Sequence, residues 1–207
     1  MTPAAGRPRW PGADLPGRRL FVAVPLPSDA TSAIADLVDR VRADGVPGGG
    51  RDVRWVRLDG VHLTLRFIGP TLPDRVEPAR SAVRAAAASS GSFDVSLGGA
   101  GRFPPSGRPR ALWLGLRVGE ADLASLAGAV DQALAAAGWT FDAKPFRAHL
   151  TLARSDGVPA GSAVGDRLEA AAAGLDVRFR ADRIGLFESV TGGGPARYEP
   201  LEIVPLR

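Results

Sequence analysis

The chain has 207 residues, enough for one large domain or for two smaller lobes that share a core. Its hydrophobic fraction of 45% and charged fraction of 23% are ordinary for a globular protein, and no apolar run reaches the roughly 20 residues that span a bilayer. There is no cysteine, which excludes disulfides and thiolate metal sites. The N-terminus carries no apolar secretory segment, so we expect a cytoplasmic protein without a membrane span.

The charge is basic and carried almost wholly by arginine. Lysine and arginine total 26 against 22 acidic residues, a net charge of +4 with an isoelectric point near 10.7. Lys144 is the only lysine. The planar guanidinium suits phosphate oxygens, which favours an anionic partner. A GC-rich coding sequence also produces a chain rich in alanine, glycine, proline and arginine, so composition alone does not identify a nucleic-acid-binding protein.

Residues 1–18 are rich in proline and glycine and predict a disordered arm, followed by a single domain over residues 19–207. The first half of that domain predicts, in chain order, a strand over 20–24, a helix over 28–45, strands over 53–56 and 61–68, a helix over 74–89, a strand over 93–97, a loop over 98–108 and a strand over 111–118. The strands on either side of Asp59-Gly60 predict a hairpin-like unit. Pro78 is expected in the first turn of its helix, because farther in it would break the helix.

The second half predicts the same alternation of strands and helices. Its elements are a helix over 122–137, a strand over 146–153, a helix over 164–174, strands over 177–186 and 201–204, and a mobile loop over 191–195. The halves also share a tetrapeptide, since the sequence His-Leu-Thr-Leu occurs at 62–65 and again at 149–152. This repeat predicts an α+β fold of two lobes related by a pseudo-two-fold axis, with antiparallel sheets, outer helices and a central cleft.

Strand geometry sorts each tetrapeptide into two faces. Residues two apart point to the same side of a strand, so His62 shares a face with Thr64, and His149 shares a face with Thr151. The leucines fall on the opposite faces and are expected in the core. A pseudo-two-fold axis would bring the two polar faces together in one groove.

Two converging histidines suit the opening of a phosphodiester. One imidazole can take a proton from the nucleophile while the other protonates the leaving oxygen, and histidine serves both roles because its ordinary pKa lies near 6.5. The hydroxyls of Thr64 and Thr151 can donate hydrogen bonds to phosphate oxygens, although threonine is also a common strand former. The chain has only two histidines, and both begin the repeated tetrapeptide, which favours a functional role over a structural one.

Other uses of these residues fit less well. A zinc site needs three or four ligands, and neither tetrapeptide contains an acidic residue that could complete it. There is no G-x-x-x-x-G-K-[ST] phosphate loop. We therefore expect no metal and no cofactor.

The residues around the repeats resemble a known family, the two-histidine phosphoesterase superfamily, and within it the RNA 2′,3′-cyclic phosphodiesterases, historically called 2′-5′ RNA ligases. The resemblance runs from Arg19 to Arg207, and Ala148 departs from the proline usual before the second histidine. The segments that carry it are 19–25 (RLFVAVP), 55–56 (WV), 62–69 (HLTLRFIG), 112–116 (LWLGL), 146–154 (FRAHLTLAR), 186–189 (LFES) and 197–201 (RYEPL).

The resemblance implies hydrolysis of RNA 2′,3′-cyclic phosphate ends to 2′-phosphates, with His62 as proton donor to O3′ and His149 as proton acceptor from water. The sequence leaves open which histidine is the acid. The resemblance also implies that Phe67 and Arg154, each five residues after a histidine, contact the nucleotide, although core packing is an alternative for Phe67.

Several points stay open. Arg102 and Arg108 flank a proline-rich loop and could follow an RNA backbone or simply be solvated, and Tyr198 could lie at the cleft rim or at a sheet edge. The expected partner is RNA with a 2′,3′-cyclic phosphate end, bound by a monomer. Alternative functions are ATP-independent 2′-5′ RNA ligation at the same site, hydrolysis of another small cyclic phosphate, and RNA binding without catalysis.

Overall fold

The computed structural model describes residues 17–43, 53–142, 145–191 and 196–207. Residues 1–16 of the expected N-terminal arm and residues 192–195 of the expected mobile loop lie outside the described residues. Arg18, the last residue of the expected arm, already belongs to strand β1. The described elements are β1 (Arg18–Pro25), α1 (Ser28–Ala43), β2 (Arg54–Trp55), β3 (His62–Thr71), α2 (Pro73–Ser89), β4 (Phe93–Phe103), β5 (Ala111–Val118), α3 (Glu120–Ala136), β6 (Leu150–Arg154), α4 (Ala160–Ala172), β7 (Val177–Ala181), β8 (Arg183–Val190) and β9 (Arg197–Pro205).

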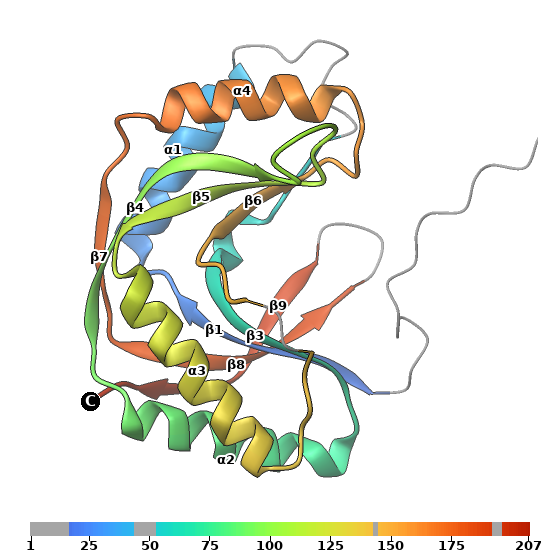
Figure 1. The fold of residues 1–207 in the computed structure, drawn as a ribbon, viewed down its shortest axis with the longest axis vertical. Helices are drawn as coiled ribbons and strands as arrows, with labels where there is room; N and C mark the ends of the chain where they lie inside the picture. The colour runs from blue at the N-terminus through green and yellow to red at the C-terminus, as the bar shows by residue number, and fades with distance from the viewer. Residues whose placement is uncertain (1–16, 44–52, 143–144, 192–195) are drawn as a thin grey trace, which may run out of the picture.

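The strands form two antiparallel sheets that face each other. One sheet has the order β3-β1-β8-β9, and the other has the order β2-β6-β5-β4-β7. In Figure 1, α2 and α3 cover the outer side of the first sheet, whereas α1 and α4 cover the outer side of the second. We call these units the His62 lobe and the His149 lobe, after the motif that each carries. The predicted α+β class with antiparallel sheets and outer helices is confirmed.

The lobes are not the two halves of the sequence. Helix α1 follows β1 of the His62 lobe but packs on α4 and β7 of the His149 lobe. Helix α3 follows β5 of the His149 lobe but packs on α2 and β3 of the His62 lobe. The halves thus exchange helices, and each lobe depends on both halves of the chain for its core.

The prediction of a hairpin-like unit around Asp59-Gly60 is wrong. Strand β2 pairs with β6, whereas β3 pairs with β1, so the two strands belong to different lobes. Between them the chain forms one turn of 3₁₀ helix, Leu58–Gly60, instead of a two-residue hairpin turn. This turn carries the chain from one sheet to the other directly before His62.

Other strand boundaries also differ from the prediction. Strand β6 begins at Leu150 and not at residue 146, so His149 lies just before the strand that was predicted to contain it. Strand β4 runs through the expected loop to Phe103, because the glycines at 98 and 99 form an irregularity in the pairing with β5 and do not end the strand. Gly99 adopts φ +67°, which glycine accepts without strain. The strand expected over 177–186 breaks at Asp182 into β7 and β8, which lie in different sheets. No proline or glycine marks this break in the sequence.

The helices follow their apolar spacing. In α1 the residues Ile34, Leu37 and Val41 recur at helical intervals and are buried. Pro78 was expected in the first turn of α2 but is the sixth residue of that helix. The helix tolerates it because the lost hydrogen bond would go to the carbonyl of Asp74, an exposed residue that water can reach. No helix among the described residues is long and apolar enough to cross a membrane.

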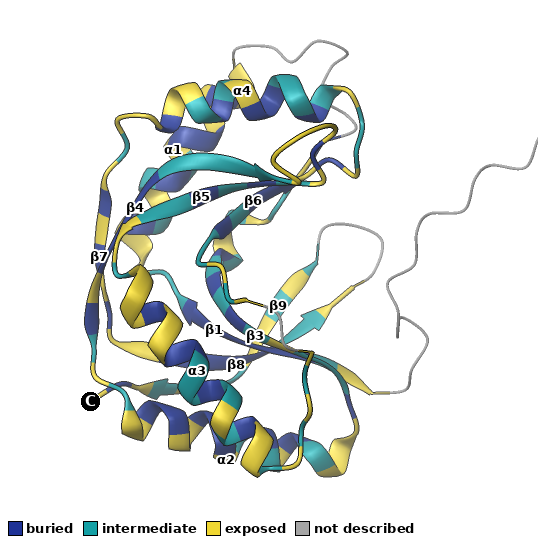
Figure 2. Cartoon of the chain, in the orientation of Figure 1, coloured by how far each residue is buried: buried dark blue, intermediate teal, exposed yellow. Residues whose placement is uncertain are grey.

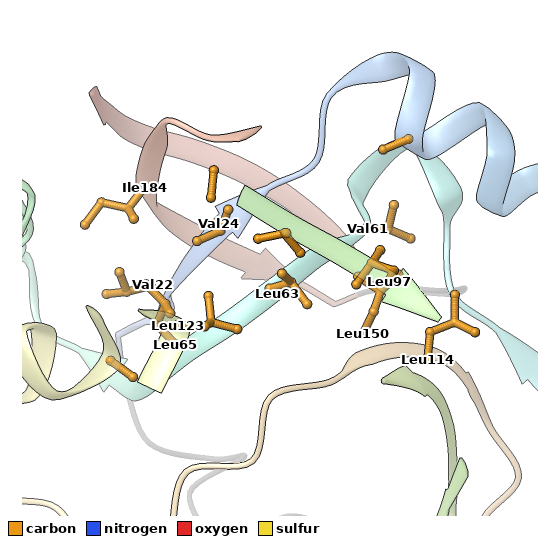
Figure 3. Close-up of a cluster of buried hydrophobic side chains, with 14 of the residues drawn as sticks. Val22, Val24, Val61, Leu63, Leu65, Leu97, Leu114, Leu123, Leu150 and Ile184 are labelled. Atoms are coloured by element: carbon orange, nitrogen blue, oxygen red, sulfur yellow. The ribbon is translucent and has the colours of Figure 1, made fainter. Parts of the chain in front are cut away.

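One large core joins the two lobes. Figure 2 shows the buried residues on the inner sides of the helices and along the sheets. The four leucines of the repeated motifs are buried, as predicted: Leu63, Leu65, Leu150 and Leu152. Figure 3 shows Leu63 and Leu150 in one cluster with side chains from both sheets. The buried halves of the two motifs therefore hold the lobes together and fix where the polar halves meet.

Candidate active site

A cavity of about 610 Å³ lies between the lobes. The His62 lobe supplies most of its walls, from β1, β3, β8 and β9. The His149 lobe contributes Thr151 and Arg154 of β6. Its lining includes five of the six predicted site residues: His62, Thr64, Phe67, Thr151 and Arg154.

His62 is half-buried, and three aromatic rings pack around its imidazole. Its ring lies 4.7 Å from the ring of Phe21, 6.3 Å from that of Phe187 and 4.8 Å, edge to face, from that of Tyr198. The Nδ1 atom lies 2.7 Å from the carbonyl oxygen of Gly60. Because a carbonyl oxygen can only accept a hydrogen bond, Nδ1 carries the proton, which leaves Nε2 to exchange protons with a substrate.

His149 has the same arrangement in the other lobe. Its Nδ1 atom lies 2.7 Å from the carbonyl oxygen of Arg147, again two residues earlier in the chain. Its ring packs edge to face against Phe103 at 5.1 Å and lies 6.2 Å from the ring of Trp113. His149 precedes the first residue of β6 and does not line the cavity itself. Thr151, two residues later, does.

Both histidines favour the neutral form in the free protein. Burial lowers the pKa of His62 below its ordinary value of 6.5, and the hydrogen bond to Gly60 opposes this shift. Burial also lowers the pKa of His149, and the positive charge of Arg154 lowers it further. The same charge acts on Tyr198 in the opposite lobe, although burial dominates and raises the pKa of that phenol. Arg154 is therefore electrostatically coupled to groups on both sides of the cleft.

Each motif strand contains a β-bulge at the same place. Leu65 has no partner on β1, because Val22 pairs with Arg66 and Ala23 pairs with Thr64. A bulge inserts one residue and shifts the following side chains to the opposite face. Phe67 therefore lies on the cavity side with Thr64, where strict alternation would place it on the opposite side.

The bulge in β6 has the same effect on the other lobe. Leu152 has no partner on β5, since Leu112 pairs with Ala153 and Trp113 pairs with Thr151. Arg154 consequently lines the cavity together with Thr151. In both motifs the fourth residue is the bulge, and it brings the side chain five positions after the histidine to the site.

The hydroxyls of Thr64 and Thr151 have no hydrogen-bond partner within the part of the chain that the structure describes. Each lines the cavity and is half-buried. A half-buried hydroxyl without a protein partner can bind an anionic ligand without breaking an existing bond.

Some predictions about single residues need correction. Arg102 was considered for an RNA contact, but its side chain is 15% exposed and bonds Asp166 and Glu169 of α4. Arg66, which was not predicted as a site residue, forms an ion pair with Asp131 of α3. Phe67 is 64% exposed, which argues against the alternative of core packing.

Tyr198 lines the cavity, which agrees with its suggested place at the cleft rim. The sequence reasoning missed the other aromatic side chains that pack against the two histidines, Phe21, Phe103, Trp113 and Phe187. Phe21, Phe187 and Tyr198 form a separate small cluster on the cavity side of the His62 lobe. Alternation along β1 was the available signal, because it puts Phe21 on the face opposite the buried residues Leu20 and Val22. A Cβ at Gly60 would come within 3.0 Å of Cδ2 of Tyr198, so a small residue there lets the ring close over the turn before His62.

No cluster of three or more His, Cys, Asp or Glu side chains that could hold a metal ion occurs among the described residues.

A family model described as the 2'-5' RNA ligase superfamily matches residues 25–193. A Geobacillus stearothermophilus protein named RNA 2',3'-cyclic phosphodiesterase is 36% identical over 135 residues, which cover 65% of this chain but only 41% of that protein. A protein of the same name from Escherichia coli (strain K12) is 28% identical over 185 residues, which cover 89% of this chain and 94% of the other.

Similarity extends to solved structures. The crystal structure of E. coli LigT complexed with 3'-AMP is similar with a TM-score of 0.70 and 26% sequence identity, covering 91% of this chain and 98% of that one. The family match spans most of the chain and includes both histidine motifs. The chain therefore belongs to the 2'-5' RNA ligase superfamily.

Proposed function

We propose that this protein is a metal-independent RNA 2′,3′-cyclic phosphodiesterase, which hydrolyses the cyclic end to a 2′-phosphomonoester. The observation that carries the proposal is the doubled His-Leu-Thr-Leu motif, whose threonines Thr64 and Thr151 come from opposite lobes and line one cavity. Two relatives whose match with this chain covers most of their own length, from Archaeoglobus fulgidus and Escherichia coli, carry the name of this activity.

The proposed reaction is an in-line displacement at phosphorus. His149 accepts a proton at Nε2 from a water molecule, whose oxygen forms the new bond to phosphorus. The bond from phosphorus to O3′ breaks, and His62 donates a proton from Nε2 to that oxygen. The products are a 2′-phosphate and a 3′-hydroxyl, and the two imidazoles return to their starting states by exchanging one proton with solvent.

The charge pattern supports this assignment of roles. Arg154 lowers the pKa of His149 and so favours the neutral imidazole that a base needs. A substrate phosphate would add negative charge near His62 and so stabilise its imidazolium form, which an acid needs. The unbonded hydroxyls of Thr64 and Thr151 would donate to the phosphate oxygens, where charge develops in the transition state.

The nucleotide would lie against Phe67 and Arg154. The exposed ring of Phe67 offers a stacking surface for a base, and Arg154 offers a guanidinium to phosphate or base. We further propose that residues 19–207 form one catalytic domain that works as a cytoplasmic monomer without a cofactor.

Ligation is a second candidate for the same site, favoured by the family to which the chain belongs. A 5′-hydroxyl of a second RNA could replace water, with His149 again accepting the proton. The strained cyclic ester supplies the energy, so no ATP is needed. We expect hydrolysis to dominate because water is abundant.

The test is hydrolysis in EDTA of an oligoribonucleotide that ends in a 2′,3′-cyclic phosphate. Wild-type protein should yield a 2′-phosphate, and His62→Ala and His149→Ala should each lose at least about 100-fold in kcat/KM. Circular dichroism and thermal unfolding would establish that both variants remain folded. Failure of the wild-type protein to open the cyclic phosphate, or full activity of either variant, would reject the proposal.

A further inference from the structure

Arginines near the cavity are held differently on the two lobes. On the His62 lobe and the turn that leads into it, carboxylates engage the exposed guanidinium groups: Arg18 bonds Glu188 at 2.7 Å, and Arg57 bonds Asp59. Arg197 pairs with Glu199 at 3.5 Å. These three positive charges are already neutralised within the protein. Arg19 of β1, which lines the cavity, is an exception on this lobe, because it has no carboxylate partner among the described residues.

The His149 lobe presents four exposed arginines beside the second motif: Arg108, Arg110, Arg147 and Arg154. None of the four has a carboxylate partner within the described ranges of the chain. Arg147 places its guanidinium 5.9 Å from the centre of the Phe103 ring, which itself packs against His149. Arg154 lines the cavity.

Backbone contacts bring Arg108, Arg110 and Arg154 to the same end of the sheet. The amide of Arg110 donates to the carbonyl of Phe103 at 2.6 Å and closes the loop between β4 and β5. The carbonyl of Arg110 accepts from the amide of Ser155 at 3.0 Å, which places the backbone of Arg110 at the end of β6, one residue beyond the pair of Ala111 with Arg154. Arg108 lies two residues earlier on the same loop. In Figure 1 this loop stands at the end of the sheet away from β7, where the two sheets diverge.

We infer that this strip, Arg108, Arg110, Arg147 and Arg154, binds the phosphodiester backbone of the RNA strand that leads to the cyclic phosphate. The inference rests on the proposed function and deepens it, because it makes a polymeric RNA the substrate and assigns its path to the His149 lobe. The strand enters over the β4–β5 loop, and its last phosphate reaches the cavity at Arg154.

The chemistry favours a phosphodiester chain as the ligand. Four guanidinium groups of like charge repel one another unless an anion neutralises them, and a guanidinium binds phosphate oxygens through two parallel N–H donors. The strip is continuous with a cavity that offers an exposed aromatic ring and two unbonded hydroxyls. A single nucleotide filling the cavity would reach Arg154 but leave Arg108 and Arg110 without a ligand.

The test compares two substrates with the same terminal nucleoside: a 2′,3′-cyclic mononucleotide and an oligoribonucleotide of about ten residues ending in the same cyclic phosphate. The variant is the double substitution Arg108→Gln and Arg110→Gln, which lies outside the catalytic cavity. The matched control is Arg40→Gln with Arg42→Gln, since these arginines of α1 are also exposed, have no carboxylate partner among the described residues, and remove the same charge.

The double variant should keep mononucleotide turnover within about twofold of wild type and lose about tenfold in kcat/KM for the oligoribonucleotide at low salt. Two lost phosphate contacts lower the salt slope on a single strand by about 1.4, so raising salt from about 50 to about 200 mM should cost the wild type about sevenfold more than the variant. The control should match wild type on both substrates. Equal loss by the control, or unchanged oligoribonucleotide turnover in the variant, would overturn the inference.

Binding separates failure of this inference from failure of the proposed function. Fluorescence anisotropy with a labelled oligoribonucleotide that ends in a 2′-phosphate does not depend on turnover. If wild-type protein hydrolyses neither substrate, the proposed function fails, and the strip is still supported when the double variant binds about tenfold more weakly than the control. If the variant and the control bind this RNA equally, the strip is rejected even when the enzyme is active.

Discussion

Phe67 and Phe21 provide a matched pair that separates recognition from folding. Their rings lie on adjacent strands with centroids 5.9 Å apart, but Phe67 is 64% exposed whereas Phe21 is 0% exposed. A buried phenylalanine removes about 200 Å² from water, so Phe67 contributes at most about 2 kcal/mol to folding at about 25 cal/mol per Å². Phe21→Ala should lower the free energy of unfolding by about 3–5 kcal/mol.

Phe67→Ala, which should cost little stability, should cause a clear loss of activity. If its ring stacks on the terminal base, Phe67→Ala loses about 1–3 kcal/mol of binding, which corresponds to about a five- to 150-fold loss of kcat/KM. Phe67→Trp should retain most of the activity, because it keeps an aromatic surface. The assays are urea denaturation for both alanine variants and steady-state hydrolysis of a 2′,3′-cyclic mononucleotide for the Phe67 variants. The reasoning is refuted if Phe67→Ala destabilises the protein as much as Phe21→Ala while its kcat/KM stays at the wild-type value.

Three further predictions concern the reacting groups. The chain has only two histidines, so NMR titration should resolve both, and both should have pKa values below 6.5. In Arg154→Met the pKa of His149 should rise, whereas that of His62 should stay nearly unchanged. Since catalysis needs one histidine protonated and one neutral, kcat/KM should peak below pH 6.5 and fall at higher pH as the required proton is lost, and a maximum above pH 7 would contradict this. Thr64→Val and Thr151→Val should each lower kcat/KM about 100-fold without loss of thermal stability, because neither hydroxyl is bonded to the described protein; a lower melting temperature with full activity would indicate a structural role.

Much of the candidate site could be predicted because the motif is repeated and its alternation is local. A strand with buried leucines at every second position exposes the residues between them, and this prediction held for Thr64 and Thr151. The positions of the helices could be predicted for the same reason, because apolar residues at intervals of three and four mark the buried face of α1 and α3.

The arrangement of strands between sheets could not be predicted from local patterns. β7 and β8 are separated only by Asp182, and the segments 177–181 and 183–190 both contain strand formers such as Val177, Phe179 and Ile184. A single aspartate does not show that the chain changes sheets there. The same limit applies to β2 and β3. Which sheet a strand joins depends on partners distant in sequence, such as the pairing of Arg54 with Arg154.

The bulges explain how the residue five positions after each motif histidine can reach the cavity although the motif lies on a strand. A strand with strict alternation places residues i and i+5 on opposite faces, so the position of Phe67 and Arg154 follows from the family resemblance and not from periodicity. Leu65 and Leu152 are buried and unpaired in their ladders, and the same irregularity recurs in both lobes. Inserting one residue on the core side is sufficient to turn the later side chain toward the cavity.

The side chains at these two equivalent positions also make the lobes unequal. The motifs themselves are identical, and both histidines donate from Nδ1 to the carbonyl two residues earlier, so the motifs alone give no basis for choosing acid and base. After the bulge, one motif presents the uncharged ring of Phe67 and the other presents the guanidinium of Arg154. The charge lies on the His149 side, where it disfavours protonation of that imidazole. The difference at the fifth position therefore breaks the symmetry of the repeat, and it is the feature behind our proposal that His149 is the base.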